Sequence, residues 1–291
     1  MAGVAGGGGT TNARHLEAEP STPAWRTKCS TFTSVDGTPR SNLARITATG
    51  ELDPGFDPAP NGMVRSLALS GSTIYAGGDF TTIGGQTRHR IAAVDATTCA
   101  ATAWNPNADG TVYSIVRSSG TVCVGGYFNL IGGQSRQNIG ALDETTGAAN
   151  EWNPGANSTV YSIDLKRFSD RIYVGGLFTG IGGQARRCVA ALDAATGVPT
   201  DWNPNANTTV YSLAVSGSTV YAGGDFTSIG GQARNHIAAL DAATGAATDW
   251  NPDADGPVVR AVAVSGSRVY VGGDFDTIGG RPRQNFAVFE P

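Results

Sequence analysis

The sequence predicts an all-β protein built from repeats of about 48 residues, and two recurring motifs carry this prediction. An Ala/Val-Gly-Gly-x-Phe motif recurs five times, at Ala76–Phe80, Val124–Phe128, Val174–Phe178, Ala222–Phe226 and Val271–Phe275. A Trp-Asn-Pro motif begins at Trp104, Trp152, Trp202 and Trp250, and Phe56-Asp57-Pro58 occupies the same place one repeat earlier. Self-similarity at such a period is the signature of a repeat architecture.

One clear copy of the repeat shows which elements to expect. Residues 210–215 alternate and are β-branched or aromatic, which predicts a strand, here called a. Residues 219–226 predict strand b, 236–241 strand c and 246–250 a short outer strand d. Ser-Gly-Ser, Gly-Gly-Gln and Ala-Thr-Gly turns separate them, and no stretch carries a helical period.

Four antiparallel strands repeated every 40–50 residues are typical of a β-propeller blade. A solenoid would need polar caps at its ends, whereas ring closure removes that need. Residues 30–37 align with Gly224–Gly231 and form a degenerate copy before the five clear ones. Six blades are the preferred count. The alternative is five closed blades, in which the strand around Phe56 completes the last blade and residues 25–48 form an appendage.

The chain divides into a leader and one repeat domain. Residues 1–24 open with MAGVAGGGG and lack a signal peptide's apolar run, so we expect a flexible Gly-rich leader. Residues 25–291 are expected to form one propeller domain, with repeats at about 25–58, 59–106, 107–154, 155–204, 205–252 and 253–291.

Composition excludes several classes of protein. The net charge is −4 with no basic stripe, so no nucleic-acid partner is expected. No run of 18 apolar residues predicts a membrane span. The four cysteines occupy unrelated repeat positions and form no C-x-x-C pair, which argues against a disulfide framework or a zinc site.

The run from Val210 to Pro252 resembles the delta-60 repeat β-propeller family of bacterial surface and secreted proteins. Its ALDAATG…W segment is also similar to the blade of pyrroloquinoline-quinone-type propellers, although no set of metal ligands accompanies it. The resemblance covers residues 25–291. It implies a propeller and a secreted or cell-surface location, and it implies little about activity, because propellers host many functions.

One arginine position is identical in every copy, and its members are Arg40, Arg88, Arg136, Arg186, Arg234 and Arg283. These arginines could form a ring that binds an anion or carboxylate at the propeller axis. We favour a structural role, in which each guanidinium pairs with a turn carbonyl or with an Asp such as Asp95, Asp143, Asp193 or Asp241. The repeated tryptophans are likewise expected to pack between neighbouring blades.

In an antiparallel blade the d–a and b–c loops emerge at the same end, so that end is the expected binding face. Its first varying set is His89, Gln137, Arg187, Asn235 and Gln284, followed directly by Arg90, Asn138, Cys188, His236 and Asn285. A second set lies in strand b, at Asp79, Tyr127, Leu177, Asp225 and Asp274. The candidate binding residues are Arg88, Arg136, Arg186, Arg234, Arg283, His89, Gln137, Arg187, Asn235, His236 and Tyr127.

The loops after the tryptophans contain Asn and Asp side chains at spacings found in calcium-binding loops. Asn251-Pro252-Asp253-Ala254-Asp255-Gly256 places oxygen ligands as the start of a calcium loop does. The bidentate acid at the end of such a loop is missing, and Asn-Pro and Asp-Gly are ordinary turn formers. Asp253 and Asp255 are therefore the candidate calcium ligands of a protein for which no other cofactor is expected.

The function expected from the sequence is non-enzymatic binding of a protein or carbohydrate on the loop-rich face. No catalytic residues are assigned, because no catalytic motif occurs and His89 and His236 lie three repeats apart. Two alternatives remain open: an enzyme (a hydrolase, lyase or cyclase) with an axial pocket on this face, and an architectural spacer in a surface protein. We expect a monomer.

Overall fold

The computed structural model describes residues 25–29, 31–165 and 170–291. The predicted leader, residues 1–24, lies outside the described residues. The described residues form strands and turns and contain no helix. It follows that none of them forms a helix able to span a membrane.

Each repeat contributes the predicted strands. The strands at position a are β5 (Val64–Ser70), β10 (Val112–Ser118), β15 (Val160–Leu165), β20 (Val210–Ser216) and β25 (Val258–Ser265). Those at position b are β1 (Trp25–Cys29), β6 (Thr73–Gly78), β11 (Thr121–Gly126), β16 (Arg171–Gly176), β21 (Thr219–Gly224) and β26 (Arg268–Asp274). Those at position c are β4 (Leu43–Thr47), β9 (Ile91–Asp95), β14 (Ile139–Asp143), β19 (Val189–Asp193), β24 (Ile237–Asp241) and β29 (Phe286–Phe289).

A small hairpin fills every b–c connection. The hairpins pair β2 (Ser34–Val35) with β3 (Thr38–Pro39), β7 (Thr82–Ile83) with β8 (Gln86–Thr87), β12 (Leu130–Ile131) with β13 (Gln134–Ser135), β17 (Gly180–Ile181) with β18 (Gln184–Ala185), β22 (Ser228–Ile229) with β23 (Gln232–Ala233), and β27 (Thr277–Ile278) with β28 (Arg281–Pro282). The tip of each clear copy holds two glycines with positive φ, such as Gly132 and Gly133. These left-handed positions explain the repeated Gly-Gly pair.

The prediction of four regular strands in each repeat is wrong for the outer strand. Among the described residues, five main sheets hold three antiparallel strands in the order a-b-c, and the sheet of β1 and β4 holds two. In the first five repeats the d segment adds a single bridge, such as Leu142 to Ala149. The reason is local. The Asn150 side chain accepts the Trp152 backbone N–H, and Pro154 has no N–H to donate, so the ladder cannot continue.

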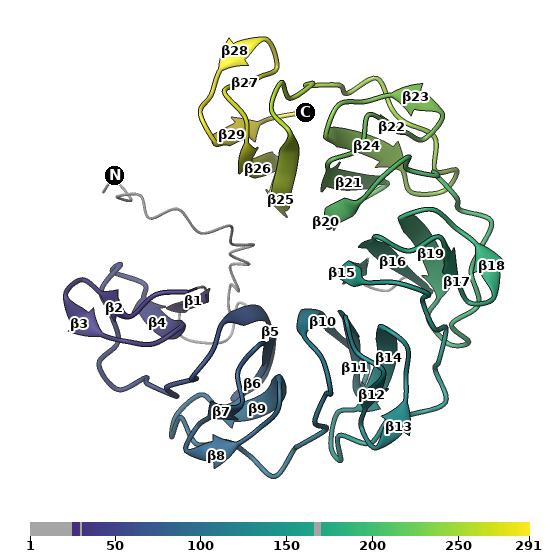
Figure 1. Ribbon diagram of the computed structural model, residues 1–291. Helices are drawn as coiled ribbons and strands as arrows, with labels where there is room; N and C mark the ends of the chain where they lie inside the picture. The colour runs from purple at the N-terminus through teal and green to yellow at the C-terminus, as the bar shows by residue number, and fades with distance from the viewer. Residues whose placement is uncertain (1–24, 30, 166–169) are drawn as a thin grey trace.

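Figure 1 shows the sheets arranged radially, with β5, β10, β15, β20 and β25 nearest the centre. Among the described residues, no strand pairing joins the sheet of β1 and β4 to the sheet of β25, β26 and β29. Closure of the ring therefore stays a prediction. Phe56 is fully buried with Leu43 and Ile74 of the first two repeats, whereas the five-blade alternative assigned its segment to the last repeat. The number of closed blades also stays a prediction.

The core lies between neighbouring repeats. Tyr75 and Ile91 of one repeat pack with Val112 and Ile115 of the next, and the other apolar clusters follow the same rule. The prediction that the tryptophans pack between repeats is confirmed for three of them. Trp104, for example, is 4% exposed, and its indole N–H donates to the carbonyl of Asp143 in the following repeat.

Candidate functional site

The repeated arginines clamp each b–c hairpin to the outer segment of its own repeat. In the fifth repeat, Arg234 Nη1 donates to the carbonyl of Ala233, and Nη2 donates to that of Thr248 at 2.7 Å. The same pair of bonds recurs at Arg40, Arg88, Arg136 and Arg186. The partners are carbonyls and not the repeated aspartates. Arg283 is exposed, and the described chain offers it no such carbonyl.

The repeated aspartates stabilise the c–d turn instead. Asp241 Oδ1 accepts the backbone N–H of Ala243 and of Thr244, and it also accepts the Thr244 hydroxyl at 2.7 Å. Asp95, Asp143 and Asp193 make the same contacts. The Thr244 bonds, first that of its side chain and then that of its backbone, hold the pKa of Asp241 below its ordinary value.

The varying positions after the arginine divide into exposed residues and residues that contact the next repeat. His89, Gln137, Arg187 and Asn235 are exposed on the loops. The residue after each of them has a positive φ of 62–67°. Its side chain reaches into the next repeat: Asn138 Nδ2 donates to the carbonyl of Ala156 at 2.8 Å, and His236 Nδ1 lies 3.1 Å from that of Ala254. A shallow hollow borders Gln137 and Asn157 on this face.

The candidate calcium loop has a structural explanation. Asp255 Oδ1 accepts the backbone N–H groups of Asp276 and Thr277, which begin the b–c hairpin of its repeat. Asn157 performs the same task with its amide oxygen. Both Asn and Asp therefore suit this position, because each offers an acceptor oxygen. In the described part of the chain, no three His, Cys, Asp or Glu side chains are grouped as metal ligands.

Three tyrosines form a row on the inner strands at the loop-rich end. The Tyr113 and Tyr161 ring centroids lie 5.0 Å apart, and those of Tyr161 and Tyr211 lie 5.1 Å apart. Each tyrosine is the second residue of its strand a, where the strand's register to strand b shifts by one residue. Such a β-bulge redirects a side chain, and all three rings remain partly exposed. We call Tyr113, Tyr161 and Tyr211 the tyrosine row.

An ion pair lies at each end of the tyrosine row. Arg65, at the same bulge position in the second repeat, contacts Asp79 at 2.7 Å, and its guanidinium lies 4.9 Å from the Tyr113 ring centroid. Arg260 contacts Asp274 at 2.7 Å in the last repeat. Asp79 and Asp274 therefore already neutralise the positive charges of Arg65 and Arg260.

The fifth repeat keeps the carboxylate of this pair without the arginine. Asp225 is equivalent to Asp79 and Asp274, but Tyr211 stands at the arginine position. Its Oδ1 is buried and has no hydrogen-bond partner among the described residues. Asp225 also raises the pKa of Tyr211, after the larger effect of burial. Burial and the two neighbouring phenols likewise raise the pKa of Tyr161. Both shifts favour the neutral phenols, beside a carboxylate for which the described residues supply no ion pair.

The varying strand-b positions lie at the same loop-rich end of the repeats as the tyrosine row, and we call this end the rim. Tyr127 is 62% exposed and Leu177 is 45% exposed, at positions equivalent to Asp79 and Asp225. Strand-b variation was visible in the sequence, whereas the tyrosine row was missed. Its signal was a position that varies directly after a valine that recurs in strand a, and its members are Arg65, Tyr113, Tyr161, Tyr211 and Arg260. A serine follows it in four of these five copies.

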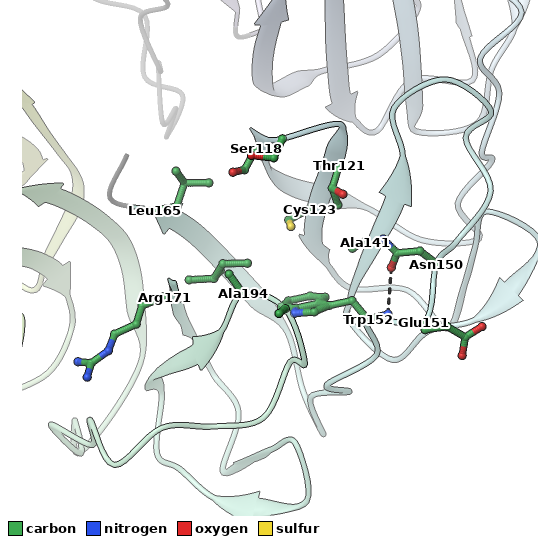
Figure 2. A pocket seen from close by; sticks show the side chains of 13 residues that line it. Ser118, Thr121, Cys123, Ala141, Asn150, Glu151, Trp152, Leu165, Arg171 and Ala194 are labelled. Carbon is green, nitrogen blue, oxygen red and sulfur yellow. Dashed lines mark hydrogen bonds between the residues drawn. The ribbon is translucent and has the colours of Figure 1, made fainter. Parts of the chain in front are cut away.

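A second cavity lies at the opposite end of the repeats, between the third and the fourth. Figure 2 shows Ser118 and Thr121 on one side of it, with Leu165 and Trp152 on others, and its volume is about 590 Å³. Burial raises the pKa of the Cys123 thiol in its wall to about 12, which favours the neutral thiol over the thiolate. The lining combines apolar side chains such as Leu165 and Trp152 with polar ones such as Glu151 and Arg171.

Comparisons with known proteins support the fold and do not identify a function. A family model described as "Domain of unknown function (DUF5122) beta-propeller" matches residues 29–56. No curated protein matches the chain. The computationally designed Ika8 protein is similar in structure, with a TM-score of 0.56 at 16% identity over 94% of this chain and 74% of that one. A chain of the Mitotic Checkpoint Complex gives 0.56 at 15% identity, over 94% and 79%. The chain is therefore built of β-propeller repeats.

Proposed function

We propose that this protein is a non-enzymatic interaction module that binds an extended protein segment carrying a lysine or arginine. The single observation behind the proposal is the tyrosine row, which ends beside the unpartnered carboxylate oxygen of Asp225. Tyrosine combines a large apolar face with a polar tip, and it is enriched at protein interfaces.

The electrostatics of the rim favour a cationic ligand group. Arg65 and Arg260 already pair with carboxylates, so Asp225 is the rim carboxylate for which the described residues supply no arginine. A lysine or arginine of the ligand could pair with the partly exposed Asp225 carboxylate and lie over the ring of Tyr211 or Tyr161. The structural likeness to a chain of the Mitotic Checkpoint Complex fits a role in protein interaction.

A peptide array tests the proposal. The array pairs short extended peptides that differ only in one lysine or its glutamine replacement, and fluorescence anisotropy measures the binding of the hits. Wild-type protein should prefer the lysine member. Asp225→Asn should lose that preference, with about tenfold weaker binding, because a charge-assisted hydrogen bond becomes a neutral one.

Tyr161→Ala should weaken binding of both members of a pair, and the exposed Asp249→Asn serves as the matched charge control. Equal binding of the lysine and glutamine peptides to wild type and Asp225→Asn would contradict the proposal. Binding on a glycan array that depends on Tyr161 but not on Asp225 would instead indicate a carbohydrate ligand, which is the other partner expected from the sequence.

A further inference from the structure

The fifth repeat shows how the edge of a strand c is normally covered. Ala247 donates its N–H to the carbonyl of Gly230 at 3.0 Å, and Thr248 donates to that of Ala239 at 2.9 Å. The carbonyl of Thr248 then accepts Arg234 Nη2. The d segment thus satisfies two carbonyls and one guanidinium of its own repeat.

The same stretch of chain continues onto the face that the fifth repeat presents to its neighbour. After Trp250, Ala254 and Val259 join the apolar cluster that contains Ile237 and Ala239. A Cβ added at Gly223 would lie 2.6 Å from Val259 Cγ1, so this glycine makes room for the neighbouring valine. One continuous segment, from d through the d–a loop to strand a, therefore covers both the edge and the face.

The described residues leave the same surface of the last repeat without that cover. β29 is the edge of its sheet, and no bridge to it is present among the described residues. Arg283 is exposed at the position of Arg234. Phe286 is 56% exposed and Val288 is 41% exposed, whereas the equivalent Ile237 and Ala239 are 0% and 2% exposed.

Among the residues that the structure describes, none fills the space above Gly272 in the last repeat. A Cβ added at Gly272, the equivalent of Gly223, would meet nothing nearer than 3.9 Å. An open strand edge beside exposed apolar side chains is a template for strand addition. The five covered copies define the sequence type that fits: a d–a segment with small residues, Trp-Asn-Pro and an alternating strand.

We propose that the last repeat is an acceptor site for one d–a segment of this repeat type, held by Arg283, the Gly279 and Val288 carbonyls and the face around Gly272. The segment would donate two backbone N–H groups to these carbonyls and offer one carbonyl to Arg283, as Ala247 and Thr248 do in the fifth repeat. This site is separate from the tyrosine row and does not depend on its function.

A synthetic peptide of residues 243–265 tests the site, because it is the d–a segment that covers the fifth repeat. Its Ala247 and Thr248 N–H groups donate to the Gly230 and Ala239 carbonyls, and its Val259 packs on Gly223. Fluorescence anisotropy of the labelled peptide on the full chain should show saturable binding. A peptide with Thr248→Pro should bind about tenfold more weakly, since proline removes the donor.

Two protein variants locate the binding. Gly272→Ala places a methyl group in the space that Val259 of the peptide would fill, so it should reduce peptide binding while leaving the melting temperature unchanged. Arg283→Ala should weaken binding with the same unchanged stability.

Equal binding of the two peptides, or of wild type and Gly272→Ala, would overturn the proposal. Binding that requires deletion of residues 1–24 would assign the site to that segment of the chain. Dimerisation that Gly272→Ala abolishes, without peptide binding, would assign it to a second copy.

Discussion

The Ser114 hydroxyl accepts the backbone N–H of Ile163, in the next repeat, at 3.0 Å. Both residues are buried on inner strands, and the same hydroxyl lies 3.3 Å from the Ile163 carbonyl. Ser66, Ser162 and Ser212 make the equivalent bond to the following repeat. A single buried side chain thus joins each inner strand to the next.

Ser114→Ala should destabilise the protein by about 1–3 kcal/mol, because the buried Ile163 N–H loses its acceptor. Urea unfolding followed by circular dichroism measures the change. Ser118→Ala removes an exposed serine from the same strand and is the control. Equal effects of the two substitutions would show that the hydroxyl contributes nothing to repeat association.

Gly125→Ala should also destabilise the protein, by about 1–3 kcal/mol, through overpacking. The added Cβ would lie 2.5 Å from Val160 Cγ1 of the next repeat. Gly272→Ala, at the equivalent position of the last repeat, should leave the free energy of unfolding unchanged. Thermal denaturation of both variants checks this contrast, and a loss of stability at Gly272 would mean that another segment covers it.

Arg136→Lys should cost about 1.5–3 kcal/mol, because an ammonium group cannot reach both the Ser135 and the Asn150 carbonyl. Arg283→Lys is the matched control, since that arginine is exposed and no second carbonyl reaches it among the described residues. Chemical denaturation should separate the two variants. Identical denaturation midpoints for the two variants would show that the arginine clamp does not stabilise the repeats.

Acid should weaken the fold through the c–d turns. Hydrogen bonds, first from the Thr146 backbone and then from its side chain, lower the folded-state pKa of Asp143. A lowered folded pKa gives stability that is present above the unfolded value of about 3.9 and is lost as the pH falls through the folded value.

Asp143→Asn should therefore reduce the slope of stability against pH below about pH 4 and change little near neutrality. Urea midpoints measured across this range check it, with the exposed Asp249→Asn as the control. An unchanged slope in Asp143→Asn would show that this turn does not contribute to acid unfolding.

Much of the fold could be predicted because the same strand and turn motifs recur in several copies of the repeat. The motif spacing located strands a, b and c, and it located the tryptophans between repeats. The outer strand was overestimated because an alternating pattern does not reveal that Asn150 bonds the Trp152 N–H and that Pro154 ends the ladder.

The candidate site was harder to predict. Variation in strand b pointed to Asp225 and Tyr127, but the tyrosine row lies inside strands that the pattern explains as structural. A bulge turns Tyr161 towards its neighbours, and alternation cannot show a bulge. His236 has a bond to the next repeat that no sequence spacing could indicate, because its positive φ directs the ring.

NMR of the tyrosine rings during titration with the best lysine peptide tests the central proposal most directly. The account predicts that the largest chemical-shift changes fall on Tyr113, Tyr161 and Tyr211 and that Asp225→Asn reduces them. Changes confined to the indole of Trp152, in the cavity at the opposite end, with silent tyrosine rings, would contradict it.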